Sequence, residues 1–257
     1  MSRFIVLMYH MISKPESAAE RRYACPPERF DSHMCQLIKN GFNPVSLDQI
    51  EQHLLFNETL PKNAVAITLD DGFADNYTHA FPILAKYQIP ATIFLASGHI
   101  ESTNQWMTPR GFPIRKMLDW QQIREMDKYN IAFGAHTVNH SKLPELNISM
   151  ANYEILASKE AVETNLGKAC KHFAYPYGLF NTENRDSVET AGYTLACSTL
   201  SGFNNVEQDT MVLHRIEVYG NDPWWKLKQK MTFGINDASL LVPMKYYANR
   251  LVNRLTL

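Results

Sequence analysis

The sequence predicts an α/β domain built on a parallel sheet. Short apolar segments alternate along the chain with longer segments of helical pattern, and this alternation is typical of parallel strands joined by helices. Polar motifs rich in Asp, His or Tyr directly follow three of the apolar segments. Because ligands and metals bind at the carboxyl ends of strands in α/β proteins, we also expect a functional site at one end of the sheet.

Strands are expected wherever a short apolar run is bounded by turn residues. They lie near Phe4–Met8, Ala64–Leu69, Ala91–Leu95, Ile131–Ala135, His172–Tyr175, Thr194–Cys197 and Val212–Val218. The expected helices lie near Pro27–Asn40, Leu47–Leu55, Asp75–Tyr87, Trp120–Tyr129, Met150–Leu166 and Glu183–Ala191. Within the first helix, apolar residues recur with the 3.6-residue period. Spacing alone does not separate an open sheet from a barrel.

The first motif places two adjacent carboxylates, Asp70 and Asp71, after the expected strand Ala64–Leu69, and Gly72 then allows a sharp turn. Neighbouring carboxylates repel each other unless a proton or a positive charge lies between them. The motif therefore indicates a bound cation, a carboxylate used as a base, or both.

The second motif carries two histidines, His136 and His140, after the expected strand Ile131–Ala135. An i, i+4 pair on one helical turn commonly gives a metal two imidazoles. Two histidines and one carboxylate leave open positions on a divalent metal, which a hydrolytic site needs. Two surface histidines are the alternative. The third motif, Tyr175-Pro176-Tyr177-Gly178, could direct a backbone N–H toward an oxyanion, although such sequences also form ordinary turns.

These three motifs, in this order and spacing, resemble those of the polysaccharide deacetylase family, the NodB-homology group or carbohydrate esterase family 4. The resemblance extends from Tyr9-His10 to about Arg215-Ile216. It implies a distorted or incomplete (β/α) barrel of the NodB-homology type with a C-terminal helical extension. A single catalytic domain over residues 1–257 is expected, with residues 224–257 as a basic amphipathic tail.

The resemblance also implies the role of each motif residue. Asp70 matches the general base, and Asp71, His136 and His140 match the metal ligands. Tyr177 matches the residue whose backbone N–H helps to hold the oxyanion. A bound metal lowers the pKa of water, and an adjacent carboxylate can remove a proton as that water attacks an amide. Zn²⁺ is the expected metal, with Co²⁺, Ni²⁺ and Fe²⁺ as alternatives.

The chain departs from the family pattern in the groups that orient the base and supply the acid. Family members often carry an arginine at the position of Ala174. Arg215, at the end of the last expected strand, is predicted to replace it as a catalytic residue. His214 is predicted as the general acid, and a histidine at a strand edge is the alternative.

Five further residues are predicted to contact substrate. His10 follows the first expected strand, and a histidine satisfied by hydrogen bonds is equally compatible with its position. Trp106 and Trp120 flank an irregular segment; aromatic rings stack on sugars, but most tryptophans are simply packed. Tyr175 and Pro176 belong to the third motif.

Composition is compatible with a single globular enzyme domain. The 257 residues are 45% hydrophobic, and the formal net charge of −1 gives no field that would attract nucleic acid. The five apolar residues after Arg3 suit a core strand rather than a signal peptide. The sequence thus predicts a cytoplasmic protein, possibly at the inner face of the membrane, acting on a glycan, lipid-linked or nucleotide-linked precursor.

The C-terminal tail is basic and carries apolar residues at helical spacing. It could dock on the barrel, or it could rest as an amphipathic helix on an anionic membrane as a peripheral contact.

The expected function is metal-dependent removal of an N-acetyl group from an amino sugar in surface polysaccharide biosynthesis. Three alternatives remain at this point. The first is another amidase, a deformylase or cyclic amidase, on the same site. The second is Mg²⁺-dependent phosphoryl transfer. The third is a sugar-binding relative without activity. Oligomeric state is not indicated.

Overall fold

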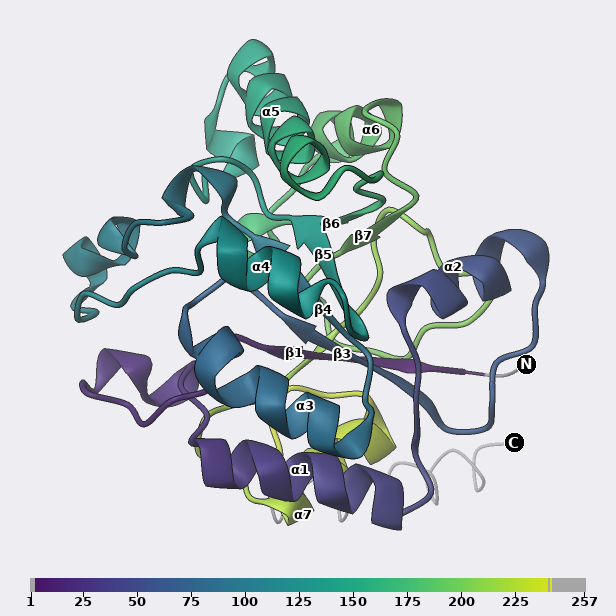
Figure 1. Cartoon of the computed structure of the whole chain (residues 1–257). Helices are drawn as coiled ribbons and strands as arrows, with labels where there is room; N and C mark the ends of the chain where they lie inside the picture. The colour runs from purple at the N-terminus through teal and green to yellow at the C-terminus, as the bar shows by residue number, and fades with distance from the viewer. Residues whose placement is uncertain (1–2, 240, 242–257) are drawn as a thin grey trace.

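A curled parallel sheet organises the chain in the computed structural model, which describes residues 3–239 and 241 (Figure 1). Its strands are β1 (Ile5–Tyr9), β2 (Asn43–Pro44), β3 (Ala64–Leu69), β4 (Ala91–Leu95), β5 (Ile131–Ala135), β6 (His172–Ala174), β7 (Leu195–Cys197) and β8 (Ile216–Glu217). The strand order is β7-β6-β5-β4-β3-β1-β8, and the short strand β2 pairs with β3. Every pairing between these strands is parallel, as the sequence predicts.

One irregular segment joins the two edges of the sheet into a distorted barrel. Leu213 forms a parallel bridge with Cys197 of β7, and Ile216 and Glu217, three residues on, pair with β1. The prediction of one continuous strand over Val212–Val218 is therefore wrong. The segment changes partner in the middle, so only its last part forms the regular strand β8.

Seven α-helices surround the sheet within the described residues. They are α1 (Pro27–Lys39), α2 (Leu47–Phe56), α3 (Phe81–Tyr87), α4 (Trp120–Met126), α5 (Ile148–Leu166), α6 (Thr182–Thr190) and α7 (Trp224–Phe233). The helix predicted over Asp75–Tyr87 is divided into a π-helical turn, Asn76–Ala80, followed by α3. Pro82 lies at this junction and has no N–H to donate to the preceding turn. The loops after β1 and β4 lie together at the left of Figure 1.

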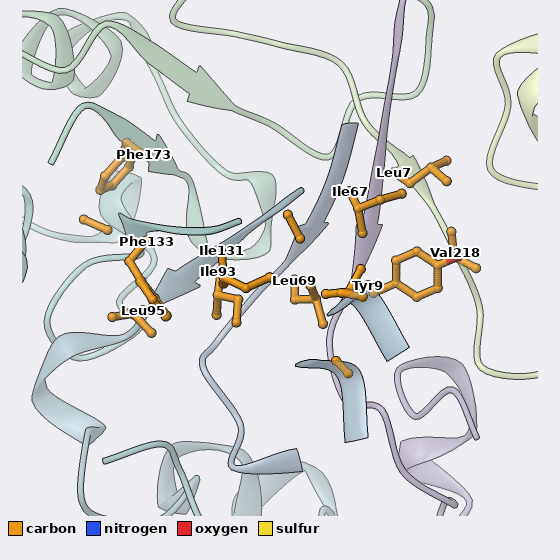
Figure 2. Close-up of a cluster of buried hydrophobic side chains, with 14 of the residues drawn as sticks. Leu7, Tyr9, Ile67, Leu69, Ile93, Leu95, Ile131, Phe133, Phe173 and Val218 are labelled. Carbon is orange, nitrogen blue, oxygen red and sulfur yellow. The ribbon is translucent and has the colours of Figure 1, made fainter. Parts of the chain in front are cut away.

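The side chains of each strand alternate between two apolar regions, as the period of two in a strand requires. Leu7, Ile67 and Ile93 belong to the large core beneath the helices, and Figure 2 shows these residues on the same side of the sheet. Val6, Ala66 and Phe94 instead belong to a smaller cluster inside the barrel. The interior is so narrow that a Cβ at Gly134 would lie 2.6 Å from the Phe94 ring. This alternation also decides which polar residues enter the barrel.

The first part of the predicted tail docks on the domain as α7. Lys230 of α7 is fully buried, pairs with Asp222 (Nζ–Oδ2, 2.5 Å) and donates to the Glu217 carbonyl of β8 (2.9 Å). Residues 240 and 242–257, which make up half of the tail predicted over residues 224–257, lie outside the described residues. In the part of the chain that the structure describes, no helix is both long and apolar enough to cross a membrane.

Candidate active site

The polar motifs meet in one cavity at the carboxyl ends of the strands. Its volume is about 200 Å³. The lining residues are Met8, His10, Arg22, Tyr23, Asp70, Asp71, Met107, Arg110, His136, His140, Tyr177, Thr199 and Glu217. Six of the predicted site residues, namely His10, Asp70, Asp71, His136, His140 and Tyr177, thus line a single cavity.

Asp71, His136 and His140 form a buried cluster whose ligand atoms all lie within 4.8 Å of one another. Asp71 Oδ1 is 3.0 Å from Nε2 of His140 and 3.5 Å from Nε2 of His136. It is nevertheless a buried oxygen without a well-formed hydrogen bond in the described structure. Carboxylate and imidazole atoms that converge in this way fit a divalent metal, because Asp and His are its ordinary oxygen and nitrogen ligands.

The protonation states also suit a metal. Burial lowers the pKa of His136 to about 4, so its imidazole is neutral at pH 7. Its Nδ1 lies 2.7 Å from the Ala174 carbonyl; because a carbonyl only accepts, the proton is on Nδ1 and the Nε2 lone pair faces Asp71. Burial would raise the pKa of Asp71, but the His140 and His10 imidazoles outweigh it and lower that pKa.

Left-handed backbone brings consecutive side chains into the same cavity. In a regular strand Asp70 and Asp71 would point to opposite faces. Asp71 instead adopts φ 75°, which ends the strand and lets both carboxylates line the cavity. Thr137, His140 and Tyr177 also have positive φ values of 62°, 55° and 58°. Non-glycine residues in this region are costly, and they cluster at functional sites where the surrounding structure holds them.

Asp70 forms a buried bidentate pair with Arg215. The Arg215 Nη1 and Nη2 atoms each lie 2.7 Å from one Asp70 carboxylate oxygen, and the Arg215 side chain has no exposed surface. Its Nε also donates to the Ser198 carbonyl at 2.8 Å. Burial would raise the pKa of Asp70, but the guanidinium lowers it below its usual value, so the carboxylate is ionised at neutral pH.

His214, the predicted acid, is not brought to the cavity. Because neighbours along an extended segment point in opposite directions, the inward Arg215 turns His214 away. The His214 ring lies against Gly202, where an added Cβ would be 2.4 Å from its Nδ1. His10 does line the cavity, with its ring 5.1 Å from that of Tyr23 and its carbonyl accepting from the Asn76 side chain.

Four predicted substrate contacts are not among the lining residues. Tyr175 lies two residues after Phe173 and therefore points to the same side of the sheet, where it is fully buried in the core beneath the helices. Pro176 is buried beside it. Trp120 packs against the same core at the start of α4. Trp106 stacks on the metal-ligand candidate His140, with ring centroids 5.3 Å apart. The Trp106 ring therefore supports His140 from outside the cavity lining.

Several lining residues were not predicted. Arg22 and Tyr23 come from the loop after β1, and Met107 and Arg110 from the loop after β4, where no motif identifies them. Glu217 could have been found, because alternation from Arg215 places it inside the barrel. Its carboxylate binds Arg22 through two hydrogen bonds of 2.8 Å and 2.5 Å.

Comparisons with known proteins agree with this geometry. The profile of the family described as polysaccharide deacetylase matches residues 57–196. The poly-beta-1,6-N-acetyl-D-glucosamine N-deacetylase of Staphylococcus epidermidis is 35% identical over 208 residues, covering 73% of this chain and 69% of the relative. The chain therefore belongs to the polysaccharide deacetylase family.

Solved structures extend the likeness to the whole barrel. The deacetylase PplD of Streptococcus pyogenes, solved in complex with acetate, superimposes with a TM-score of 0.77 and 28% identity over 89% of this chain and 98% of PplD. IcaB of Ammonifex degensii gives a TM-score of 0.78 and 26% identity over 90% of this chain and 97% of IcaB. The family's distorted (β/α) barrel is thus the fold of this chain, as predicted.

Proposed function

We propose that this chain hydrolyses the N-acetyl group of an amino sugar in a surface polysaccharide, using a divalent metal held by Asp71, His136 and His140. The observation that carries the proposal is the Arg215-bound carboxylate of Asp70 beside these three buried ligand atoms in one cavity. Relatives named as poly-beta-1,6-N-acetyl-D-glucosamine N-deacetylases support N-acetylglucosamine as the sugar.

Zn²⁺ is the metal that we propose, because two imidazoles and one carboxylate are a common zinc ligand set. Bound there, the metal would act as a Lewis acid that lowers the pKa of water and polarises the amide carbonyl. The chain's own contribution is to hold the three ligands buried, with His136 fixed in the correct tautomer by the Ala174 carbonyl.

Asp70 is proposed as the general base. Arg215 keeps the Asp70 carboxylate ionised and binds both of its oxygens. The carboxylate therefore faces the cavity in one orientation. From there it can take a proton from water that attacks the acetamide carbon. Arg215 thereby supplies the orientation that an arginine at position 174 supplies in other family members.

Two further groups complete the proposed reaction. Tyr177 lines the cavity, with its ring 4.6 Å from that of His140, and its backbone N–H is proposed as a donor to the developing oxyanion. His10 is proposed as the general acid in place of His214, because it is an imidazole of the cavity wall and His214 is not. It would protonate the departing amine.

The same machinery would serve a deformylase or a cyclic amidase, so the acyl group needs a direct test. The test measures metal per chain together with acetate release from N-acetylglucosamine oligomers, for wild type and for Asp70→Asn. We expect about one metal per chain in both proteins and acetate from the wild type alone. Formate release, or acetate release that is equal in the two proteins, would contradict the proposal.

A further inference from the structure

The loop between the two histidine ligands has an unusual backbone. It leaves β5 at His136, and left-handed conformations at Thr137 (φ 62°) and His140 (φ 55°) return the chain to the cavity. Both residues carry a Cβ, and threonine is branched there, so neither adopts this conformation without a cost. Other contacts must therefore hold the loop of residues 137–139.

A buried carboxylate on α5 supplies those contacts. Glu154 is 2% exposed. Its Oε2 accepts the backbone N–H groups of Val138 (2.8 Å) and Asn139 (2.9 Å), and its Oε1 accepts the Asn139 side-chain amide (2.7 Å). No lysine or arginine within residues 3–239 forms a salt bridge with it. The charge of Glu154 is thus balanced by N–H groups of one loop, and charge-assisted bonds of this kind are strong.

The opposite side of the loop is also fixed. The backbone N–H groups of Ser97 and Gly98, which follow β4, donate to the carbonyls of Thr137 (3.1 Å) and Val138 (2.8 Å). A Cβ at Gly98 would lie 2.9 Å from Val138, so the two segments are in close contact. The loop is clamped between the β4 turn and Glu154, and only the Glu154 side of the clamp depends on a single side chain.

We propose that Glu154 is a positioning residue that sets the metal affinity of the site. It fixes the loop of residues 137–139 and thereby the separation and direction of the two imidazoles. This inference rests on the proposed metal-dependent function. It assigns a role to a residue of α5 that lies outside the cavity lining and outside all three sequence motifs.

The chemistry of Glu154 makes its amide variant informative. In Glu154→Gln one carboxylate oxygen becomes an NH₂ group, which would face N–H donors. The volume of the side chain is nearly unchanged. The variant therefore removes an acceptor without leaving a hole. Glu160→Gln is the matched control, because Glu160 lies on the same helix and is exposed.

The experiment measures the Zn²⁺ dissociation constant of the full chain by competition with a chromophoric chelator, and the Tm with and without Zn²⁺. For Glu154→Gln we expect Zn²⁺ binding to weaken by roughly 10–100-fold, the size of effect known for outer-sphere partners of metal ligands. Its Zn²⁺-induced rise in Tm should shrink accordingly. Glu160→Gln should match the wild type in both quantities.

The two quantities separate positioning from a general structural role. If Glu154→Gln lowers the Tm of the metal-free and loaded proteins equally and keeps the wild-type Zn²⁺ affinity, Glu154 only supports the fold and the inference is wrong. Glu154→Ala provides a second test of the same expectation. If the wild type itself binds no Zn²⁺, Co²⁺ or Ni²⁺, the proposed function fails, and that result differs clearly from equal binding by wild type and variant.

Discussion

Two clusters of carboxylates and imidazoles lie at opposite ends of the sheet. One follows the carboxyl ends of β3 and β5, and the other joins α2 to the first residue of β6. In both, the candidate ligand atoms lie within 4.8 Å of one another. The first cluster is Asp71, His136 and His140, and the second is Asp48, Glu51 and His172.

Only the first cluster has the properties of a metal site. In the second, Asp48 is exposed, whereas all three residues of the first are buried. Lys171 Nζ lies 3.4 Å from Asp48 and 3.6 Å from Glu51, so an ammonium group neutralises both carboxylates. In the first, Asp71 is buried and, among the residues that the structure describes, forms salt bridges with the two histidines and with no lysine or arginine. Residue types and proximity are therefore insufficient, because a metal also needs buried ligand atoms whose charge no lysine neutralises.

The largest expected effect comes from removing a ligand of the first cluster, and the same kind of change in the second cluster serves as the control. His140→Ala should reduce Zn²⁺ affinity by more than the roughly 10–100-fold that loss of an outer-sphere partner costs, and acetate release should be lost with it. His172→Gln should leave the metal content at the wild-type level. Elemental analysis of dialysed protein measures both. Loss of metal in His172→Gln would show that the second cluster is a genuine site.

The Asp70–Arg215 pair should be the next most sensitive feature. Removing one partner of a buried ion pair typically costs about 3–5 kcal/mol of stability, so Arg215→Ala should destabilise the fold and reduce turnover far more than metal content. Arg185→Ala is the control, because the Arg185–Asp209 pair is near the surface and such pairs contribute only about 0–1 kcal/mol. Urea unfolding, kcat and metal per chain test this. A parallel loss of metal and turnover would argue that Arg215 is merely structural.

The metal-free site should make stability depend on pH. His136 has a folded-state pKa of about 4, below the ordinary value of about 6.5, so the unfolded chain binds the proton more tightly. The contribution of neutral His136 to the free energy of unfolding is thus present above about pH 6.5 and is lost as the pH falls toward 4. This contribution is ~3 kcal/mol at most. Urea unfolding in EDTA should show this fall, with a shallower slope in His136→Gln. Identical slopes would contradict the assignment.

Trp106 should have the smallest effect, and on metal rather than sugar. Its ring stacks on His140 and is absent from the cavity lining. Trp106→Phe should therefore weaken Zn²⁺ binding by a few-fold and leave the KM for the glycan nearly unchanged. Competition with a chelator and initial-rate kinetics measure the two values. A large rise in KM at unchanged metal affinity would restore the predicted sugar contact.

Most strands, helices and metal-ligand candidates could be predicted from the sequence because they depend on local patterns. Apolar runs of strand length identify the regular strands β1, β3, β4 and β5. Where the chain exchanges partners, as at Leu213 and Ile216, the pattern is continuous but the strand is not. Pro82 likewise lies inside a helical pattern that the structure divides.

The sequence by itself determined that Asp70, Asp71, His136 and His140 would meet, because the carboxyl ends of parallel strands share one edge of the sheet. Only the tertiary structure decided which neighbours join them. Arg215 enters the barrel while His214 and Tyr175 turn away, since alternation is fixed by the register of the pairing strands. The contact of Glu154 with the histidine loop likewise depends on how α5 packs, and helix packing brings together residues that no local sequence pattern connects.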